Sequence, residues 1–586
     1  MLIFTMKNFL KTFGGYSLAV VGTAIFGIVA YSLFLPAMNF ESMGFYVFWA
    51  AVFGAMTGFF KLASISAHER RSDKIVSEKK EAGESIWRYD VKEAKRHSLS
   101  WKIPSMIAMA MLAVFVLGCI SGLRIFNVGS SCNLIGGSIE KKDVSEYWVG
   151  VEHMPKVEVV GYDDTTGGEF KDTASYLATY AFGDLGLDST QYVLKEGNFQ
   201  TIGDVNYKAY PVGHADILKW NKNKEKGCGD YILINADKKV VKETENSSVK
   251  KFAKPIIYSD SAFFGQDLDR HIRLQYPTKI FNEKFFEIND NNEAFYIVPF
   301  YTHTIGLFGG KVVEEVMILD ANTGLSEVFA TNNLPKWVNA IYSPERLIKY
   351  YNLNAKYMGG FWNGWFGQEG VSQLTYNSNV EGSDNNYKAY ALFAVNGETY
   401  FCTGKTSVST DESNMGFIIG NLKTGVIEEY TSKNGNNFST AEEYSVMKSF
   451  QEDEPVKAYG YVAGFPMVVN VEGKLTYVST LKSHAGATKA YSFMELANVN
   501  NVITNSNFDT AYDKYVDKQI EKIGVLEEIR TANIDGTTLY YLYIDGQVYS
   551  VSVKDNENVV LKNVGDLVTL NIAKSESDSI IPAKLK

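Results

Sequence analysis

Three long runs of apolar residues, at 14–38, 44–60 and 103–126, stand out at the start of the chain. The first run contains no charged residue, and about 20 apolar residues suffice for a helix to cross a bilayer. A cleavable signal peptide is the alternative for this run. Such a peptide has a shorter apolar stretch and is not followed at once by a second one. The pattern therefore predicts three transmembrane helices within residues 1–126.

A basic segment at 67–102 separates the second run from the third. It carries ten Lys and Arg residues among charges of both signs, which predicts a solvated helical loop. Loops rich in Lys and Arg stay on the cytoplasmic side of a membrane. Since Lys7 and Lys11 also precede the first run, we expect a cytoplasmic N-terminus. Everything beyond Arg124 is then expected to be extracytoplasmic.

Ala50, Gly54 and Gly58 form a stripe of small residues on the second predicted helix. Such a stripe lets another helix approach closely. We expect the first helix of the same chain to be the neighbour. The alternative is a homo-oligomer contact through the same three residues.

Beyond residue 126, short β-branched and aromatic runs alternate with tight turns. Two such runs flank each of the dipeptides Asn396-Gly397, Glu472-Gly473 and Asp545-Gly546, which predicts three β-hairpins. The fold class is therefore a membrane-anchored α+β protein. Its three N-terminal transmembrane helices are followed by a multi-module, mainly antiparallel β region.

A second pattern consists of a strand, a turn that ends in Thr-Gly, and another strand. One copy lies at 294–330 with the turn Asp320–Gly324, and a weaker one lies at 400–430, where Asn421 replaces the Asp. A helix is predicted before the first copy, at 266–275. Another is predicted after it, with Ser343 as N-cap. This arrangement resembles the PepSY-type module of bacterial envelope proteins, which implies a small extracytoplasmic domain engaged in protein contacts rather than catalysis.

Two further resemblances concern the architecture. Residues 255–370 together with the C-terminal part resemble membrane-anchored envelope proteins of Gram-positive bacteria and their phages, a likeness that implies no activity. Five strands predicted within 520–572 resemble a small OB-type barrel. The predicted domains are therefore a membrane part at 1–126, a mixed α/β domain at 127–250, a PepSY-like module at 251–370, a second β-rich module at 371–519, an OB-like barrel at 520–574 and a loose tail at 575–586.

Charge is distributed unevenly along the 586 residues. The part up to Arg124 holds 14 Lys and Arg against 8 Asp and Glu, whereas the whole chain has a net charge of −10. The predicted extracytoplasmic region is thus acidic. Nucleic acid is excluded as its main partner, because phosphate backbones are bound by clustered Lys and Arg.

Four cysteines are present, and none lies in a CxxC pair or at ligand spacing from a histidine. We therefore expect no metal site and no cofactor. In an oxidising compartment, Cys132 and Cys228 are candidates for a disulfide, with unpaired thiols as the alternative.

The densest polar cluster contains Asp267, Arg270 and His271, which share one face of the predicted helix at 266–275. An acid–base or anion site is one interpretation. An ion-paired, solvated helix face is the more common one. No zincin, nucleophile-elbow or phosphate-loop motif accompanies the cluster. No catalytic residue is therefore assigned.

The most unusual segment is 358–370, where Phe361, Trp362, Trp365 and Phe366 lie among glycines. These aromatics predict a loop that binds a sugar or a protein, or one that enters the membrane interface. The alternative is a loop buried between two modules. The function we expect is that of a non-enzymatic membrane-anchored envelope protein that binds a protein or a wall polymer. An envelope hydrolase using Asp267 and His271, and a phage protein that modifies the host envelope, are the alternatives.

Overall fold

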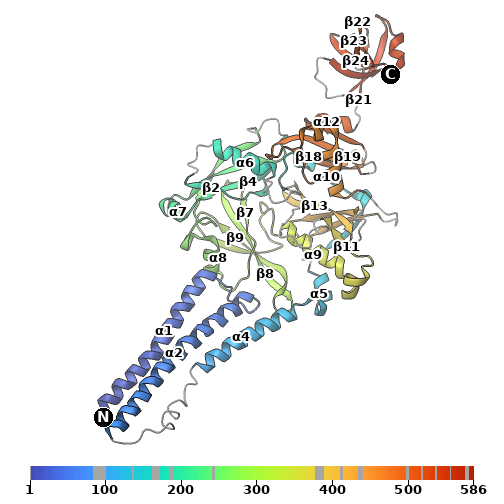
Figure 1. The fold of residues 1–586 in the computed structure, drawn as a ribbon. Coiled ribbons are helices and arrows are strands. Elements are labelled where there is room, and N and C mark those ends of the chain that lie inside the picture. Colours follow the sequence, from blue (N-terminus) through green and yellow to red (C-terminus); the bar gives the residue numbers. More distant parts are fainter. Residues whose placement is uncertain are drawn as a thin grey trace.

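The computed structural model describes residues 2–82, 101–134, 138–161, 172–184, 190–239, 245–375, 389–408, 414–432, 440–496, 501–516, 519–534, 537–554, 556–573 and 580–585. Three N-terminal helices form a bundle, and a β-rich region sits on one end of it (Figure 1). The C-terminal sheet lies at the opposite end of the β-rich region from the helices.

The helices of the bundle are α1 (Leu2–Phe34), α2 (Met43–Glu81) and α4 (Lys102–Ser121). Each contains a stretch long and apolar enough to cross a membrane, which confirms the three predicted spans. The bounds differ from the prediction where the backbone dictates it. Pro36 cannot continue α1, because its ring blocks the helical geometry of the residue before it. α2 continues beyond its apolar part into the basic segment as far as Glu81.

The small-residue stripe on α2 does not face α1, contrary to the prediction. Glycines of α1 make the close approach instead: Gly22 lies against Phe59 and Gly27 against Val52. Side chains added at Gly54 or Gly58 would meet no described atom within 4 Å. The two helices pack through large residues of α2 resting on small ones of α1, so the stripe on α2 is open.

The β-rich region repeats one unit, a helix followed by a four-stranded antiparallel meander, four times. Module A comprises α6 (Thr173–Asp184), β3 (Asn198–Ile202), β4 (Val205–His214), β5 (Cys228–Asn235) and β6 (Ser247–Ile256). Module B comprises α8 (Leu268–Gln275), β7 (Phe285–Ile288), β8 (Ala294–Ile305), β9 (Gly309–Asp320) and β10 (Ser326–Ala330). Module C comprises α9 (Pro344–Tyr357), β12 (Ala391–Val395), β13 (Glu398–Ser407), β14 (Asn414–Asn421) and β15 (Ile427–Thr431). Module D comprises α10 (Glu443–Glu452), β17 (Met467–Val471), β18 (Lys474–Lys482), β19 (Thr488–Glu495) and β20 (Val502–Asn505).

Smaller elements extend these modules. Four further strands pair with β15, β4, β13 and β18 respectively: β1 (Ile139–Asp143), β2 (Tyr192–Leu194), β11 (Ser372–Leu374) and β16 (Val462–Ala463). The short helices are α5 (Val128–Cys132), α7 (Ile217–Asn223), α11 (Glu454–Tyr459) and α12 (Phe508–Tyr515). The parallel pairing of β1 with β15 ties the segment that follows the helix bundle to the sheet of module C.

The turn between the third and fourth strands of a module is also repeated. In module B, the Asp320 side chain accepts hydrogen bonds from the backbone N–H groups of Asn322 and Thr323, at 2.7 and 3.2 Å. Asn421 of module C accepts the equivalent pair, because an amide oxygen can replace a carboxylate oxygen there. The next residue after this Asp or Asn uses its backbone oxygen to accept hydrogen bonds from two consecutive N–H groups. Those N–H groups belong to the segment that precedes the module's helix. This pattern recurs at Ala236, Ala321 and Leu422.

The three predicted hairpins are confirmed. β12 pairs with β13, β17 with β18, and β23 (Thr537–Ile544) with β24 (Gln547–Ser552). Both central residues of each turn have positive φ, for example 53° at Asn396 and 78° at Gly397. A two-residue turn of this kind matches the twist of the strands, and glycine adopts its second position without strain.

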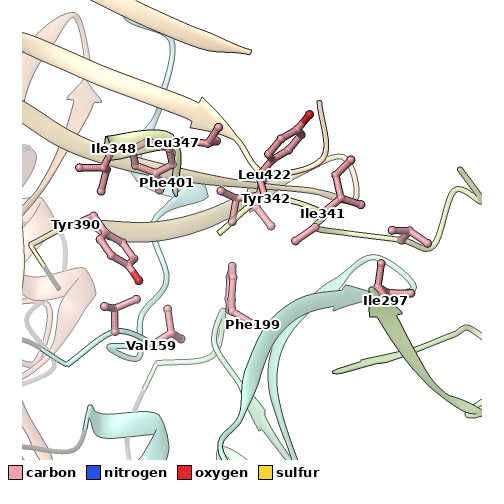
Figure 2. Packing of buried hydrophobic residues seen from close by; sticks show 14 of the residues in the cluster. Val159, Phe199, Ile297, Ile341, Tyr342, Leu347, Ile348, Tyr390, Phe401 and Leu422 are labelled. Carbon is pink, nitrogen blue, oxygen red and sulfur yellow. The ribbon is translucent and has the colours of Figure 1, made fainter. Parts of the chain in front are cut away.

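The four modules share their hydrophobic cores. One cluster combines residues of modules A, B and C, and another combines modules C and D. Figure 2 shows Val159 and Phe199 of module A lying across from Tyr390 and Phe401 of module C, with Ile297 of module B beside them. A module separated from its neighbours would therefore expose apolar side chains that are now buried.

The C-terminal sheet corrects three predictions. Instead of a five-stranded barrel it is an open sheet of six strands, in the order β21-β25-β26-β24-β23-β22. The expected loose tail supplies β26 (Ile580–Leu585), which lies between β24 and β25. Val559–Leu561, expected as a strand, belongs to a 3-10 helix at Glu557–Leu561. The remaining strands are β21 (Gln519–Val525), β22 (Glu528–Ile534) and β25 (Leu567–Ala573).

Module B sits directly on the helix bundle. The Arg273 side chain donates to the backbone oxygen of Leu35 at 3.1 Å, and the Met38 N–H donates to Pro277 at 2.7 Å. The ring of Phe308, in the β8–β9 turn, lies against Gly118 of α4 and 5.6 Å from the Tyr46 ring of α2. Phe308 therefore contacts both α2 and α4, two helices that also pack directly against each other.

Replacing Gly118 with Val is expected to displace Phe308, because a Cβ at this position would overlap its ring. Overpacking of this kind costs about 1–3 kcal/mol. Thermal unfolding of the full chain in detergent micelles measures the loss. Gly54→Val is the matched control, since its side chain would enter open space on α2. Equal melting temperatures for the two variants would contradict the contact.

Candidate functional site

A cavity of about 470 Å³ lies where the β-rich region meets the helix bundle. Its walls come from the residues after α4, from the β8–β9 turn, from α9 and from the loop before β7. The lining includes Gly122, Arg124, Leu134, Glu283, Ile305, Phe308, Lys311, Glu345, Arg346, Lys349, Tyr350 and Leu353. The cavity thus joins a membrane-spanning helix to modules B and C.

Two carboxylates line the cavity, and both are engaged by neighbours. The Glu283 carboxylate accepts hydrogen bonds from the guanidinium of Arg346 at 2.8 Å and from the hydroxyl of Tyr301 at 3.0 Å. Glu345 accepts a hydrogen bond from Tyr390 at 2.7 Å. The Arg346 guanidinium also lies 4.1 Å from the centre of the Tyr301 ring. These contacts fix α9 against β8 and leave little acidic surface facing the cavity.

Three cations of the cavity are not neutralised in this way. Within the described part of the chain, the side chains of Arg124, Lys311 and Lys349 have no ion pair with a carboxylate. Burial and the charges of Arg346 and Lys349 hold the pKa of Lys311 below its usual value, although the charge of Glu283 acts in the opposite direction. A bound anion would offset both effects, since it brings negative charge to a half-buried cation. The lining therefore has the electrostatics of an anion site.

The cavity also has apolar lining residues. Ile305, Phe308, Leu134 and Leu353 contribute hydrocarbon surface, beside polar groups of Ser131, Asn282 and Ser343. A cavity with cations on one part of its wall and hydrocarbon on another suits a ligand that has both an anionic group and an apolar one. A phosphate carried by a lipid has this chemistry, and so does a phosphate-bearing polymer attached to one.

A second hollow, of about 370 Å³, lies between modules A and B. Its lining contains Lys195 and Lys284 but also Glu196 and Asp260, so its charges balance. Lys284 is bound to Asp260 and Asp269, at 2.8 Å each. This hollow has no excess charge with which to attract an anion.

The structure places the predicted polar cluster in supporting roles. Asp267 caps α8 by accepting the N–H of Arg270 at 2.9 Å, and burial raises the pKa of its carboxyl. The His271 ring lies on Tyr258, and its Nε2 is 2.8 Å from the backbone oxygen of Gly324, the last residue of the turn Asp320–Gly324 in module B. Asp267 and His271 thus bind different backbone groups, and neither lines the two cavities described above.

The predicted aromatic residues follow α9 on one further helical turn. Phe361 is half-buried, with its ring stacked on Tyr357 at 6.0 Å. Trp362, Trp365 and Phe366 are instead exposed, by 66, 53 and 78 % respectively. The loop is therefore displayed rather than buried between modules.

The cysteines are free, so the structure has the unpaired thiols rather than the candidate bridge between Cys132 and Cys228. Cys132 belongs to α5, which packs on α9, whereas Cys228 is buried in module A. Its Sγ lies 3.6 Å from Nε2 of His214, a pair that could suggest a nucleophile and a base. Burial raises the pKa of this thiol to about 12, so the reactive thiolate is not populated at neutral pH.

Within the described residues, no group of His, Cys, Asp and Glu side chains is arranged to hold a metal ion. The cavity itself was not anticipated from the sequence. Arg124, Lys311 and Lys349 are far apart along the chain and belong to no motif. The local sequence signal is Gly309-Gly310-Lys311, a lysine after two glycines at the start of β9.

Comparison with known proteins adds no assignment: no family model, no curated protein and no solved structure matches this chain.

Proposed function

We propose that this chain is a non-enzymatic, membrane-anchored binding protein of the cell envelope. The cavity between α4 and α9 would receive the anionic, phosphate-bearing part of a ligand at the membrane surface. The observation that carries the proposal is the group of unpaired cations, Arg124, Lys311 and Lys349, at the end of a membrane-spanning helix. Charge-assisted hydrogen bonds of Lys and Arg to phosphate are among the stronger polar contacts in proteins.

The charge pattern of the spans supports an orientation for this function. Basic residues before the first span and between the second and third favour the cytoplasm for both segments. The β-rich region would then lie on the extracytoplasmic side, where lipid-linked and wall polymers are found. The repeated helix-and-meander modules are compatible with the PepSY-like character inferred from residues 294–330. They would act as a binding scaffold.

A binding measurement tests the proposal. The full chain is placed in nanodiscs of phosphatidylcholine and titrated with glycerol 3-phosphate. In a second arm it is placed in nanodiscs that contain phosphatidylglycerol, and bound lipid is counted by native mass spectrometry. We expect Lys311→Gln/Lys349→Gln to weaken binding by about tenfold or more, since each charged hydrogen bond contributes about 1.5–3 kcal/mol. Binding in the first arm alone would identify a soluble phosphate ligand, and in the second alone a lipid headgroup.

The matched control is Lys448→Gln/Lys457→Gln, which removes two exposed lysines of module D. Both double variants change the net charge equally, so general electrostatic attraction would weaken them alike. Equal affinities of wild type and both variants, in both arms, would overturn the proposal.

A further inference from the structure

The exposed aromatic surface after α9 consists of Met358, Trp362, Trp365 and Phe366, and we call it the aromatic patch. Trp362, Trp365 and Phe366 lie three or four residues apart on consecutive helical turns, and Met358 precedes them in the turn at the end of α9. Trp362 and Phe366 stack on each other, with ring centres 5.9 Å apart. All four side chains are more than half exposed, with Met358 at 62 %.

Ring stacking and side-chain hydrogen bonds fix the backbone turn that carries the patch. Phe361 and Tyr357 stack as parallel rings, and Asn363 closes the turn by accepting the N–H of Glu369 at 3.1 Å and donating to its oxygen at 2.9 Å. The exposed rings are therefore presented by an ordered turn. Large aromatic surface left in water is costly, and on soluble faces it usually marks a contact with a partner or a membrane.

The patch lies at the membrane end of the β-rich region. Tyr357, at the base of the patch, lies under the guanidinium of Arg124, which follows the last residue of α4 closely. α5 connects the two, since Asn354 of α9 donates to the backbone oxygen of Cys132 at 2.7 Å. In Figure 1 the end of α9 and α5 lie beside the upper end of α4.

Neighbouring residues continue the same chemistry. Leu123, Ile125 and Phe126, between α4 and α5, are exposed by 50, 45 and 70 %. The ammonium of Lys356 lies 4.2 Å from the centre of the Trp365 ring. Tryptophan accompanied by lysine and aliphatic residues is typical of the zone where lipid headgroups meet acyl chains, because an indole has both an apolar body and a polar N–H.

We infer that the aromatic patch inserts into the headgroup zone of the membrane leaflet from which α4 emerges. Trp362, Trp365 and Phe366 enter the lipid, and Lys356 stays at its surface beside the phosphates. The occupant of this surface is the bilayer, because the surface continues the lipid-facing residues of a spanning helix. This attachment does not depend on ligand binding in the cavity.

Quenching of tryptophan fluorescence tests the inference. The full chain is reconstituted into vesicles of phosphatidylcholine and, separately, into vesicles of the same lipid brominated near the headgroup end of its acyl chains. The contribution of the patch is the emission of wild type minus that of Trp362→Phe/Trp365→Phe, which preserves aromatic side chains. We expect brominated lipid to quench more than about half of this difference, since bromine acts only on tryptophans at lipid depth.

Trp220→Phe supplies the control, since Trp220 is buried in module A. The emission of wild type minus that of Trp220→Phe should be the same in both kinds of vesicle. If the emission assigned to the patch is also the same in both, the patch faces water or a protein, and the inference is wrong. Retained phosphate binding alongside that result would leave the proposed function standing, because the two measurements report different surfaces.

Discussion

Replacing Lys482 with Met is expected to lower the free energy of unfolding by about 3–5 kcal/mol. Lys482, at the end of β18 in module D, is fully buried and donates to Oε2 of Glu158 at 2.6 Å. Glu158 precedes α6 in module A, and its other carboxylate oxygen is buried with no hydrogen-bond partner among the described residues. Without Lys482, an uncompensated charge remains between the first and the last module.

Urea unfolding of the full chain in micelles, followed by circular dichroism, measures this effect. Lys482→Met/Glu158→Gln should recover much of the loss, because the unpaired carboxylate is then neutral. Lys474→Met is the control on the same strand, since its pair with Glu495 is solvent-exposed and such pairs contribute less than about 1 kcal/mol. A double variant as unstable as Lys482→Met would show that packing, rather than the charge, sets the cost.

Glu443 is expected to make the stability of the protein depend on pH. Its carboxyl is buried between modules C and D, where it accepts the Thr375 hydroxyl at 2.7 Å and the Asn414 amide at 3.3 Å. Burial raises its pKa from 4.5 to about 7. The folded protein therefore holds this proton more tightly than the unfolded chain does. The stabilisation is complete below pH 4.5 and is lost as the pH rises through about 7.

A pKa difference of this size corresponds to ~3 kcal/mol. The free energy of unfolding of the wild type should therefore fall by about that much more than that of Glu443→Gln between about pH 4 and 8. The amide can still accept from Asn414 and donate to Thr375, so the variant should fold. Glu454→Gln changes an exposed carboxylate on α11 and should follow the wild type. Parallel pH curves for wild type and Glu443→Gln would contradict the assignment.

The elements that the sequence predicted well are those set by local chemistry. Apolar length determines the spans, the Asn396-Gly397 type of dipeptide determines the hairpins, and the Ser343-Pro344 cap determines the start of α9. The predictions were wrong where the structure of a segment depends on contacts with residues far away in the sequence. β26 resembles a loose tail until it is paired on both sides, and the expected barrel stays open because its strands follow another order.

The candidate site illustrates the same limit. Lys311 and Lys349 approach Arg124 only because α9 packs against α5 and the β8–β9 turn rests on α4. The spacing of these three residues along the chain does not predict that their side chains lie close together. The aromatic patch, in contrast, lies within one short segment, so the sequence could single out Trp362, Trp365 and Phe366, together with the half-buried Phe361. What the segment could not reveal is which direction the rings face.

The contacts between the helix bundle and the β-rich region limit how that region can move. With one point of contact, the β-rich region could rotate freely on the bundle. With two, it could still rotate about the line that joins them. Three are present: the α1–α2 hairpin on module B, Gly118 against Phe308, and α5 on α9. These contacts therefore fix the orientation of the β-rich region relative to the helix bundle, so that a tilt of the bundle would tilt the β-rich region with it.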